Sequence, residues 1–144
     1  MEKVLDLVKK ASMLAGKKIM EYYETKLIIQ NKSANNPVTI ADFESNKIIY
    51  EFLTDNYPEF GWLSEETRDT PKRLKKEFIW IVDPLDGTKE FIEGIPNFAV
   101  SIALVLNNKP IIGVLYNPAT EELFYAQKDR GAFYNNNQIQ CSKQ

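Results

Sequence analysis

Hydrophobic positions in the first part of the chain recur at helical spacing. Residues 4–23 place apolar side chains every three or four positions and carry Lys and Glu on the opposite face, which predicts an amphipathic helix. A second helix is predicted from Thr39, because Thr39 followed by Asp42 has the form of a capping box and residues 48–53 supply an apolar face.

Between these helices the pattern is weaker. Residues 27–29 either extend the first helix or start a short strand, and residues 31–37, which contain Lys, Ser, Asn and Pro, are predicted to form a loop. Asn, Pro and Gly within residues 56–61 then end the helical pattern.

The second half of the chain shows short apolar runs that predict β-strands. Residues 107–109 (Asn-Asn-Lys) predict a hairpin turn between two of them. The runs are residues 78–82, 98–106, 111–116 and 122–126, followed by a weak pair at 133–134 and 139. Helices followed by an antiparallel meander indicate one α+β domain, with two N-terminal helices packed on an antiparallel sheet.

Composition narrows the classes of function. The 144 residues are 44% hydrophobic and 26% charged, with a net charge of −2, as in ordinary globular proteins. The densest basic run, at residues 72–76, predicts a solvated loop. Without a larger basic patch, no nucleic-acid polymer is expected as a partner. No segment has the length of a membrane span or the core of a signal peptide, so no membrane partner is expected.

The lone cysteine, Cys141, allows no internal disulfide and suits a reducing compartment. A cytoplasmic location is therefore expected. The chain has no histidine, which excludes histidine-based triads, phosphohistidine and histidine-ligated zinc within it. Any chemistry must rest on carboxylates, hydroxyls, lysines and backbone groups.

An acidic string follows the first predicted strand. Residues 83–88 read Asp-Pro-Leu-Asp-Gly-Thr. Close carboxylates after a buried strand are costly unless a cation offsets their repulsion. Pro84 pushes Asp83 toward an extended conformation, so both carboxylates can point the same way and suit Mg²⁺, with the Leu85 carbonyl as a further ligand. Gly87 permits close backbone approach, and a helical turn over residues 88–91 would offer N–H groups to phosphate. An isolated Asp-X-X-Asp would more often cap a turn.

The whole string resembles the signature of the inositol monophosphatase superfamily, and its Thr-Lys-Glu-Phe continuation looks like the 3′(2′),5′-bisphosphate nucleotidase branch. Leu-Ser-Glu-Glu at residues 63–66 resembles the family's upstream acidic motif, which points to Glu65 as a metal ligand. Residues 37–42 resemble the segment whose aspartate, here Asp42, helps to orient the attacking water. Alone, the Glu-Glu pair would be a solvated loop and Asp42 a helix cap. Three motifs in order are more specific than any one.

The resemblance implies a Mg²⁺-dependent phosphomonoesterase acting on a small phosphate ester, with lithium inhibition and competition from calcium. Glu65, Asp83 and the Leu85 carbonyl would hold one metal, and Asp83 would bridge to a second that Asp86 also binds. Thr88 would act with Asp42 on the nucleophilic water. The N–H groups of Gly87 and Thr88 would contact the phosphate.

One departure from the resemblance concerns length. Family members are about twice as long, and their C-terminal half supplies a further metal-binding aspartate and much of the leaving-group pocket. The chain is therefore expected to be the metal-binding N-terminal domain of a two-domain phosphatase, residues 1–144, with the C-terminal domain absent from it. Adenosine 3′,5′-bisphosphate is the favoured substrate, ahead of inositol monophosphate and fructose 1,6-bisphosphate. A catalytically incomplete metal- or phosphate-binding fragment is a rival reading, and a homodimer stays open.

Overall fold

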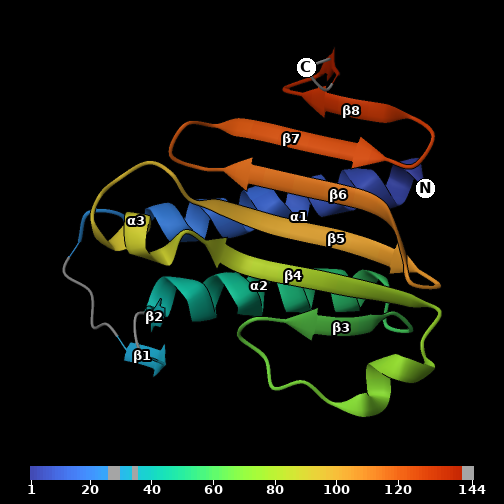
Figure 1. The fold of residues 1–144 in the computed structure, drawn as a ribbon, viewed down its shortest axis with the longest axis horizontal. Helices are drawn as coiled ribbons and strands as arrows, with labels where there is room; N and C mark the ends of the chain where they lie inside the picture. Colours follow the sequence, from blue (N-terminus) through green and yellow to red (C-terminus); the bar gives the residue numbers. More distant parts are fainter. Residues whose placement is uncertain (26–29, 34–35, 141–144) are drawn as a thin grey trace.

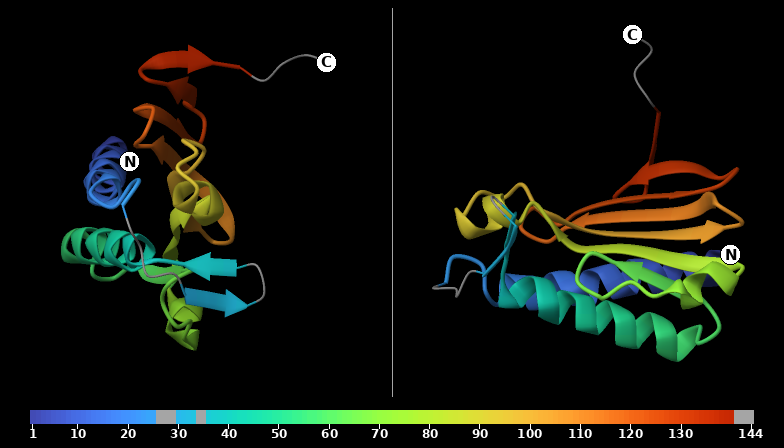
Figure 2. Two further views of the ribbon diagram at one scale, coloured as in Figure 1. Left: turned by 90° about the vertical axis from the view of Figure 1, so that its left-hand side faces the viewer. Right: turned by 60° about the horizontal axis from the view of Figure 1, so that its bottom comes forward.

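Two helices, α1 (Glu2–Met20) and α2 (Ile40–Asn56), cover one face of a seven-stranded sheet (Figure 1; Figure 2, left). The computed structural model describes residues 1–25, 30–33 and 36–140. The predicted α+β class, with two N-terminal helices on a mostly antiparallel sheet, is confirmed. The predictions for residues 27–29 and for Cys141 lie outside the described residues.

Helix α1 ends three residues earlier than the predicted boundary at residue 23. Its last turn tightens, because Glu21 N–H bonds to Lys18 O and Tyr22 N–H bonds to Ile19 O. Tertiary contacts then hold the two tyrosines: the hydroxyl of Tyr22 donates to Glu44 at 2.9 Å, and that of Tyr23 donates to Gly94 O at 2.7 Å. The apolar spacing continues past the helix because these rings are packed there.

The large sheet has the order β3-β4-β5-β6-β7-β8-β9, and all neighbours are antiparallel except β3 and β4. Its strands are β3 (Gly61–Ser64), β4 (Phe78–Asp86), β5 (Ala99–Leu106), β6 (Lys109–Asn117), β7 (Glu122–Gln127), β8 (Gly131–Tyr134) and β9 (Asn137–Ile139). A short helix, α3 (Thr88–Ile92), follows β4. The predicted turn between β5 and β6 is confirmed, with positive φ at Asn107 and Asn108.

Strand β3 was not predicted, and it runs parallel to β4, which makes the sheet mixed. The pairing matches Trp62 with Trp80 and Ser64 with Val82. The connection between the two strands contains the 3₁₀ helix Pro71–Lys75, where the sequence predicted a solvated loop. Only four residues long and partly exposed, β3 has too short an apolar run to be recognised from its pattern.

The loop predicted over residues 31–37 is wrong for most of that segment. Strand β1 (Gln30–Ser33) pairs antiparallel with β2 (Asn36–Val38). Strand β1 is entirely polar, and β2 is only three residues long and contains a proline, so no hydrophobic alternation marks either strand. The ladder rests on backbone hydrogen bonds, which composition does not reveal.

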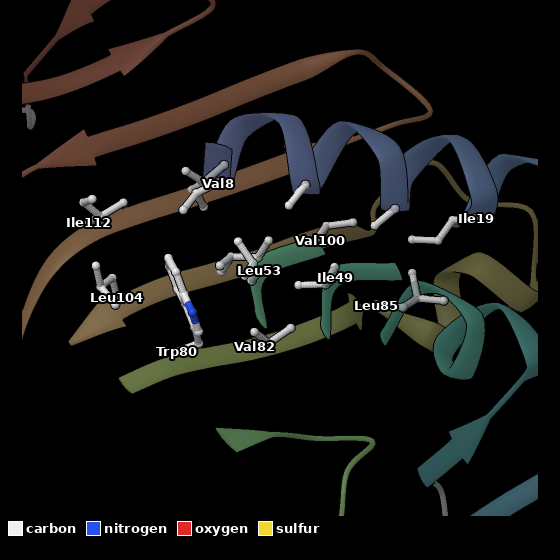
Figure 3. Packing of buried hydrophobic residues seen from close by; sticks show 14 of the residues in the cluster. Val8, Ile19, Ile49, Leu53, Trp80, Val82, Leu85, Val100, Leu104 and Ile112 are labelled. Carbon is white, nitrogen blue, oxygen red and sulfur yellow. The ribbon is translucent and has the colours of Figure 1, made fainter. Parts of the chain in front are cut away.

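The hydrophobic core lies between the helices and the inner face of the sheet (Figure 3). Helix α1 contacts β5 and β6, while α2 contacts β4. Among the fully buried side chains are Val8, Ile19, Ile49, Leu53, Trp80, Val100 and Leu104. This packing holds α2 directly behind β4, the strand that carries the acidic string.

The other face of the sheet is also apolar. Ile81 on β4, Leu115 on β6 and Phe124 on β7 expose 42%, 40% and 36% of their surface. The small residues Ala103 and Gly113 line a shallow hollow on this face together with Leu115 and Phe124. No helix of the described residues covers this face (Figure 2, left), and none of them is long and apolar enough to cross a membrane. An antiparallel sheet with one solvated face normally presents polar residues there. The apolar side chains on this face are instead typical of a surface that packs against another part of a protein.

Candidate active site

The acidic string lies on a β-bulge at the C-terminal end of β4. Asp83 pairs with Ser101 and Asp86 pairs with Ala99, so three steps along β4 correspond to two along β5. Pro84 has no N–H for the neighbouring strand, which favours an irregularity here. Residues three apart on a regular strand point to opposite faces. The extra residue instead brings Asp83 and Asp86 to the same side, where both line one pocket.

This pocket, of about 230 Å³, collects most of the predicted site. Six of the seven predicted residues line it: Glu65, Asp83, Leu85, Asp86, Gly87 and Thr88. Glu66, Lys89 and Glu90 line it as well. The pocket therefore combines five carboxylates with one lysine and the first residues of α3.

Glu65 reaches the pocket through the parallel pairing of β3 and β4. Ser64 lies opposite Val82, and the N–H of Glu65 donates to Val82 O at 3.2 Å. The residue that follows β3 is thus held beside Asp83, which follows Val82. Strands that run parallel end at the same edge of the sheet, and this brings the two acidic segments together.

The seventh predicted residue, Asp42, lies behind the pocket and is 1% exposed. Its Oδ2 accepts the N–H and the hydroxyl of Thr39, both at 2.8 Å, which completes the predicted capping box. Its Oδ1 accepts the hydroxyl of Thr88 at 2.9 Å. The Thr88 hydroxyl also lies 3.2 Å from Leu85 O. Asp42 therefore caps α2 and contacts the pocket residue Thr88 at the same time.

The pKa of Asp42 is raised by burial, and hydrogen bonds from Thr39 and Thr88 oppose that rise. A carboxylate with three donors can stay ionised in such a position, and the raised pKa makes it a better proton acceptor than an exposed aspartate.

Ser45 was not recognised from the sequence. It lies on α2 and is fully buried, and its hydroxyl donates to Pro84 O at 2.8 Å. The bond ties the bulge of β4 to the helix behind it. A serine within the buried face of a predicted helix was the available signal, because a buried hydroxyl needs a partner.

Asp83 shows the electrostatic character of the pocket. Burial raises its pKa from 3.8 to about 6, and the negative charges of Asp86 and Glu65 add to that rise. The N–H of Leu85 donates to Asp83 Oδ1 at 3.3 Å and opposes it. A divalent cation would offset this repulsion, and oxygen-only donors suit Mg²⁺.

The carboxylate oxygens of the pocket do not form a closed coordination shell. No three Asp, Glu, His or Cys side chains of the described residues converge closely enough to hold a metal ion alone. Mg²⁺ sites in proteins commonly use one or two carboxylates and complete their shell with water and substrate phosphate. Carboxylates spaced around an open pocket fit that kind of site better than an all-protein cage.

Gly87 joins the bulge to α3 and adopts φ +92°. A Cβ on this residue would lie 2.6 Å from Asn97 O. Only glycine suits both the left-handed conformation and this close approach. The turn leaves the first N–H groups of α3 outside the helix's own hydrogen bonds, at the edge of the pocket.

Comparison with known proteins gives consistent matches. The family model described as "Inositol monophosphatase family" matches residues 1–144. Inositol monophosphatase 2 of Solanum lycopersicum is 37% identical over 147 aligned positions, which cover 100% of this chain and 56% of the relative. The structure of the extragenic suppressor protein suhB of Bartonella henselae superposes with a TM-score of 0.93 at 38% identity, covering 99% of this chain and 55% of the other.

CysQ of Bacteroides thetaiotaomicron, described as a bacterial member of the inositol monophosphatase family, superposes with a TM-score of 0.78 at 35% identity. The match covers 100% of this chain and 53% of CysQ. The chain spans about half the length of the curated relatives it matches.

Proposed function

This chain belongs to the inositol monophosphatase family, and on that basis we propose that it carries the metal and phosphate site of a Mg²⁺-dependent phosphomonoesterase acting on a small phosphate ester. The observation that carries the proposal is the convergence of Glu65, Asp83 and Asp86 on one pocket, beside Thr88 and its partner Asp42. These residues come from three separate segments of the chain.

Glu65, Asp83, Asp86 and the Leu85 carbonyl are the proposed metal ligands. They are oxygen donors on one pocket. Burial, followed by the charges of Asp86 and Glu65, raises the pKa of Asp83, which supports a cation as the partner of these carboxylates. A bound divalent ion there supplies charge neutralisation for the phosphate and lowers the pKa of water.

Thr88 and Asp42 are proposed to orient the attacking water and receive its proton. The Thr88 hydroxyl donates toward Asp42 Oδ1, which leaves a lone pair on Oγ1 to accept a hydrogen bond from water in the pocket. A proton that leaves the water can pass to Thr88 Oγ1 as the hydroxyl proton passes to Asp42. Burial raises the pKa of Asp42, so its carboxylate accepts a proton more readily than that of an exposed aspartate.

The phosphate is proposed to bind at the N–H groups of Gly87 and Thr88, with Lys89 on the same pocket as a compensating positive charge. A second hollow, lined by Asp86, Gly87, Glu90 and Asn97 among others, adjoins the first across the Asp86–Gly87 backbone. It offers space for the alcohol side of the ester.

Adenosine 3′,5′-bisphosphate is the first proposed substrate, on the resemblance of residues 88–91 to the nucleotidase branch. Inositol monophosphate is the second, favoured by a specific observation: the relatives at 37% to 44% identity include proteins named inositol monophosphatase or inositol-1-monophosphatase. The two readings share the same metal site and differ in the leaving group.

We also propose that residues 1–144 form the metal-binding half of a two-domain protein. The relatives are about twice as long, and the uncovered sheet face around Leu115 and Phe124 is apolar. A second half packed on this face would bury it and stand next to the hollow beside Asp86.

The test is phosphate release with Mg²⁺ from adenosine 3′,5′-bisphosphate, inositol 1-phosphate and fructose 1,6-bisphosphate. Wild type is compared with Asp83→Asn and with Asp55→Asn, a matched change at an exposed aspartate near the end of α2. Release that only Asp83→Asn lacks would support the proposal and name the preferred substrate.

Calorimetric Mg²⁺ titration separates the remaining outcomes. Binding that Asp83→Asn abolishes, without turnover, would identify a metal-binding half that needs its second half for catalysis. Mg²⁺ binding unchanged in Asp83→Asn would refute the metal site.

A further inference from the structure

The turn that carries Glu65 is weakly held by its own backbone. Residues 65–67 follow Ser64, the last residue of β3, and the turn is closed by a long bond of 3.4 Å from Thr67 N–H to Ser64 O. Glu65 itself is exposed. If nothing else held this turn, the Glu65 carboxylate would sample many positions relative to Asp83.

Asn46 on α2 spans this turn from one end to the other. Its Oδ1 accepts the hydroxyl of Ser64 at 2.5 Å, and its Nδ2 donates to Thr67 Oγ1 at 2.9 Å. A single amide side chain therefore bonds the residue before Glu65 and the residue after Glu66. These bonds connect residues 18 and 21 positions apart in the chain.

Two further donors complete the network. The hydroxyl of Ser64 also accepts the N–H of Glu66 at 3.3 Å, and Thr67 Oγ1 also accepts the indole N–H of Trp62 at 3.1 Å. The ring of Trp62 packs edge-on against Tyr50 of α2, with centroids 5.0 Å apart. Because each hydroxyl is used as donor or acceptor in a defined direction, the network specifies one orientation of the turn.

The same helix anchors the other acidic segment. Asp42 bonds Thr88 and Ser45 bonds Pro84 O. Positions 42, 45 and 46 are three and four residues apart, so they lie on one side of α2. The first two turns of α2 thus hold the bulge, the start of α3 and the glutamate turn in one relative arrangement.

We propose that Asn46 is a positioning residue that fixes the Glu65 turn against the β4 bulge and thereby sets the divalent-cation affinity of the pocket. The inference rests on the proposed function, in which Glu65 is a metal ligand. Residues that orient metal ligands typically contribute 10- to 100-fold to metal affinity.

The experiment compares Asn46→Ala with Asn56→Ala in the 144-residue chain. Asn56 is a matched control at the other end of α2, where its Nδ2 donates to Phe52 O at 2.7 Å. Calorimetric Mg²⁺ titration and amide hydrogen exchange without metal are measured for each. Asn46→Ala should weaken Mg²⁺ binding at least about tenfold and speed exchange at Glu66 and Thr67, whereas Asn56→Ala should do neither.

A conservative variant separates positioning from general stability. Asn46→Asp keeps an oxygen for the Ser64 hydroxyl, and Thr67 can rotate its own hydroxyl to donate to the second oxygen. Exchange at Glu66 and Thr67 should then return close to that of wild type. If Asn46→Ala does not fold, Thr67→Ala at an exposed position removes one of the two bonds and carries the same test.

The two proposals fail in different ways. Wild-type Mg²⁺ affinity and exchange in Asn46→Ala would overturn the role of Asn46 while leaving the metal site intact. If wild type itself binds no Mg²⁺, the metal site fails, and with it the effect on affinity; hydrogen exchange then decides separately whether Asn46 holds the turn.

Discussion

Thr88 Oγ1 lies 2.9 Å from Asp42 Oδ1, although 46 positions separate the two residues in the chain. The bond joins the N-terminus of α2 to the N-terminus of α3. It places a hydroxyl of the pocket in contact with a buried carboxylate that Thr39 already holds through two hydrogen bonds. Asp42 cannot turn away from Thr88 without losing those bonds.

Thr88→Ala should therefore lower both activity and stability. Loss of the proton path should reduce phosphate release at least about 100-fold, and the unpaired Oδ1 of buried Asp42 should cost about 1–3 kcal/mol of unfolding free energy. Thr88→Ser keeps the hydroxyl and should recover most of both. Thr25→Ala, which removes an exposed hydroxyl bond to Tyr22 O, is the control in urea unfolding and phosphate assays. Equal activity of the Thr88 and Thr25 alanine variants would contradict the assigned role.

Asp83 should make the metal-free protein less stable as the pH rises. Its pKa is raised from 3.8 to about 6 in the folded state, so between those values the folded state binds more protons than the unfolded state. The contribution of Asp83 to stability is therefore most favourable below about pH 4 and falls as the pH rises to about 6. Above pH 6 the penalty is roughly 1–1.5 kcal/mol, after halving the full value for solvent screening.

Asp83→Asn should remove that penalty, so at pH 7.5 without metal it should unfold at higher urea concentration than wild type. Mg²⁺ should stabilise wild type and leave the variant unchanged. A substitution that increases stability while abolishing activity would mark Asp83 as a functional residue. A variant less stable than wild type at pH 7.5 would show that the carboxylate repulsion is already relieved.

The two neighbouring glutamates should differ. Glu65→Gln should weaken Mg²⁺ binding at least about tenfold, since even residues that only orient ligands contribute that much. Glu66→Gln should change it by less than about threefold, because a ligand role is assigned to Glu65 alone. Calorimetric titration of both variants measures the difference, and the opposite order would reassign the ligand to Glu66.

Gly87→Ala should destabilise the protein by about 2–3 kcal/mol, because alanine is strained at φ +92° and its Cβ would lie 2.6 Å from Asn97 O. Gly113 is a matched control on β6, where an added Cβ meets no atom within 4 Å and φ is not positive. Thermal unfolding of both alanine variants tests this. Equal midpoints would mean that the turn at Gly87 relaxes freely.

Local signals in the sequence were reliable where the physics is local. The apolar spacing of residues 4–20, the capping box of Thr39 and the turn at Asn107 each depend on residues within a few positions of one another. The effect of Pro84 is local as well: the sequence predicted that Asp83 and Asp86 can point the same way, although the bulge that brings this about was not predicted. These features predicted the α+β class and the position of the acidic segment before any long-range contact was known.

Tertiary structure alone decided how the separate segments meet. Hydrophobic periodicity encodes which face of an element is buried, but it does not specify which strand lies beside it or in which direction. The parallel pairing of β3 with β4 places Glu65 beside Asp83, and the packing of α2 behind β4 brings Asp42 to Thr88 and Asn46 to the glutamate turn. Polar side chains at such positions resemble caps and loop residues in the sequence, and only the folded chain supplies the partners that make them a site.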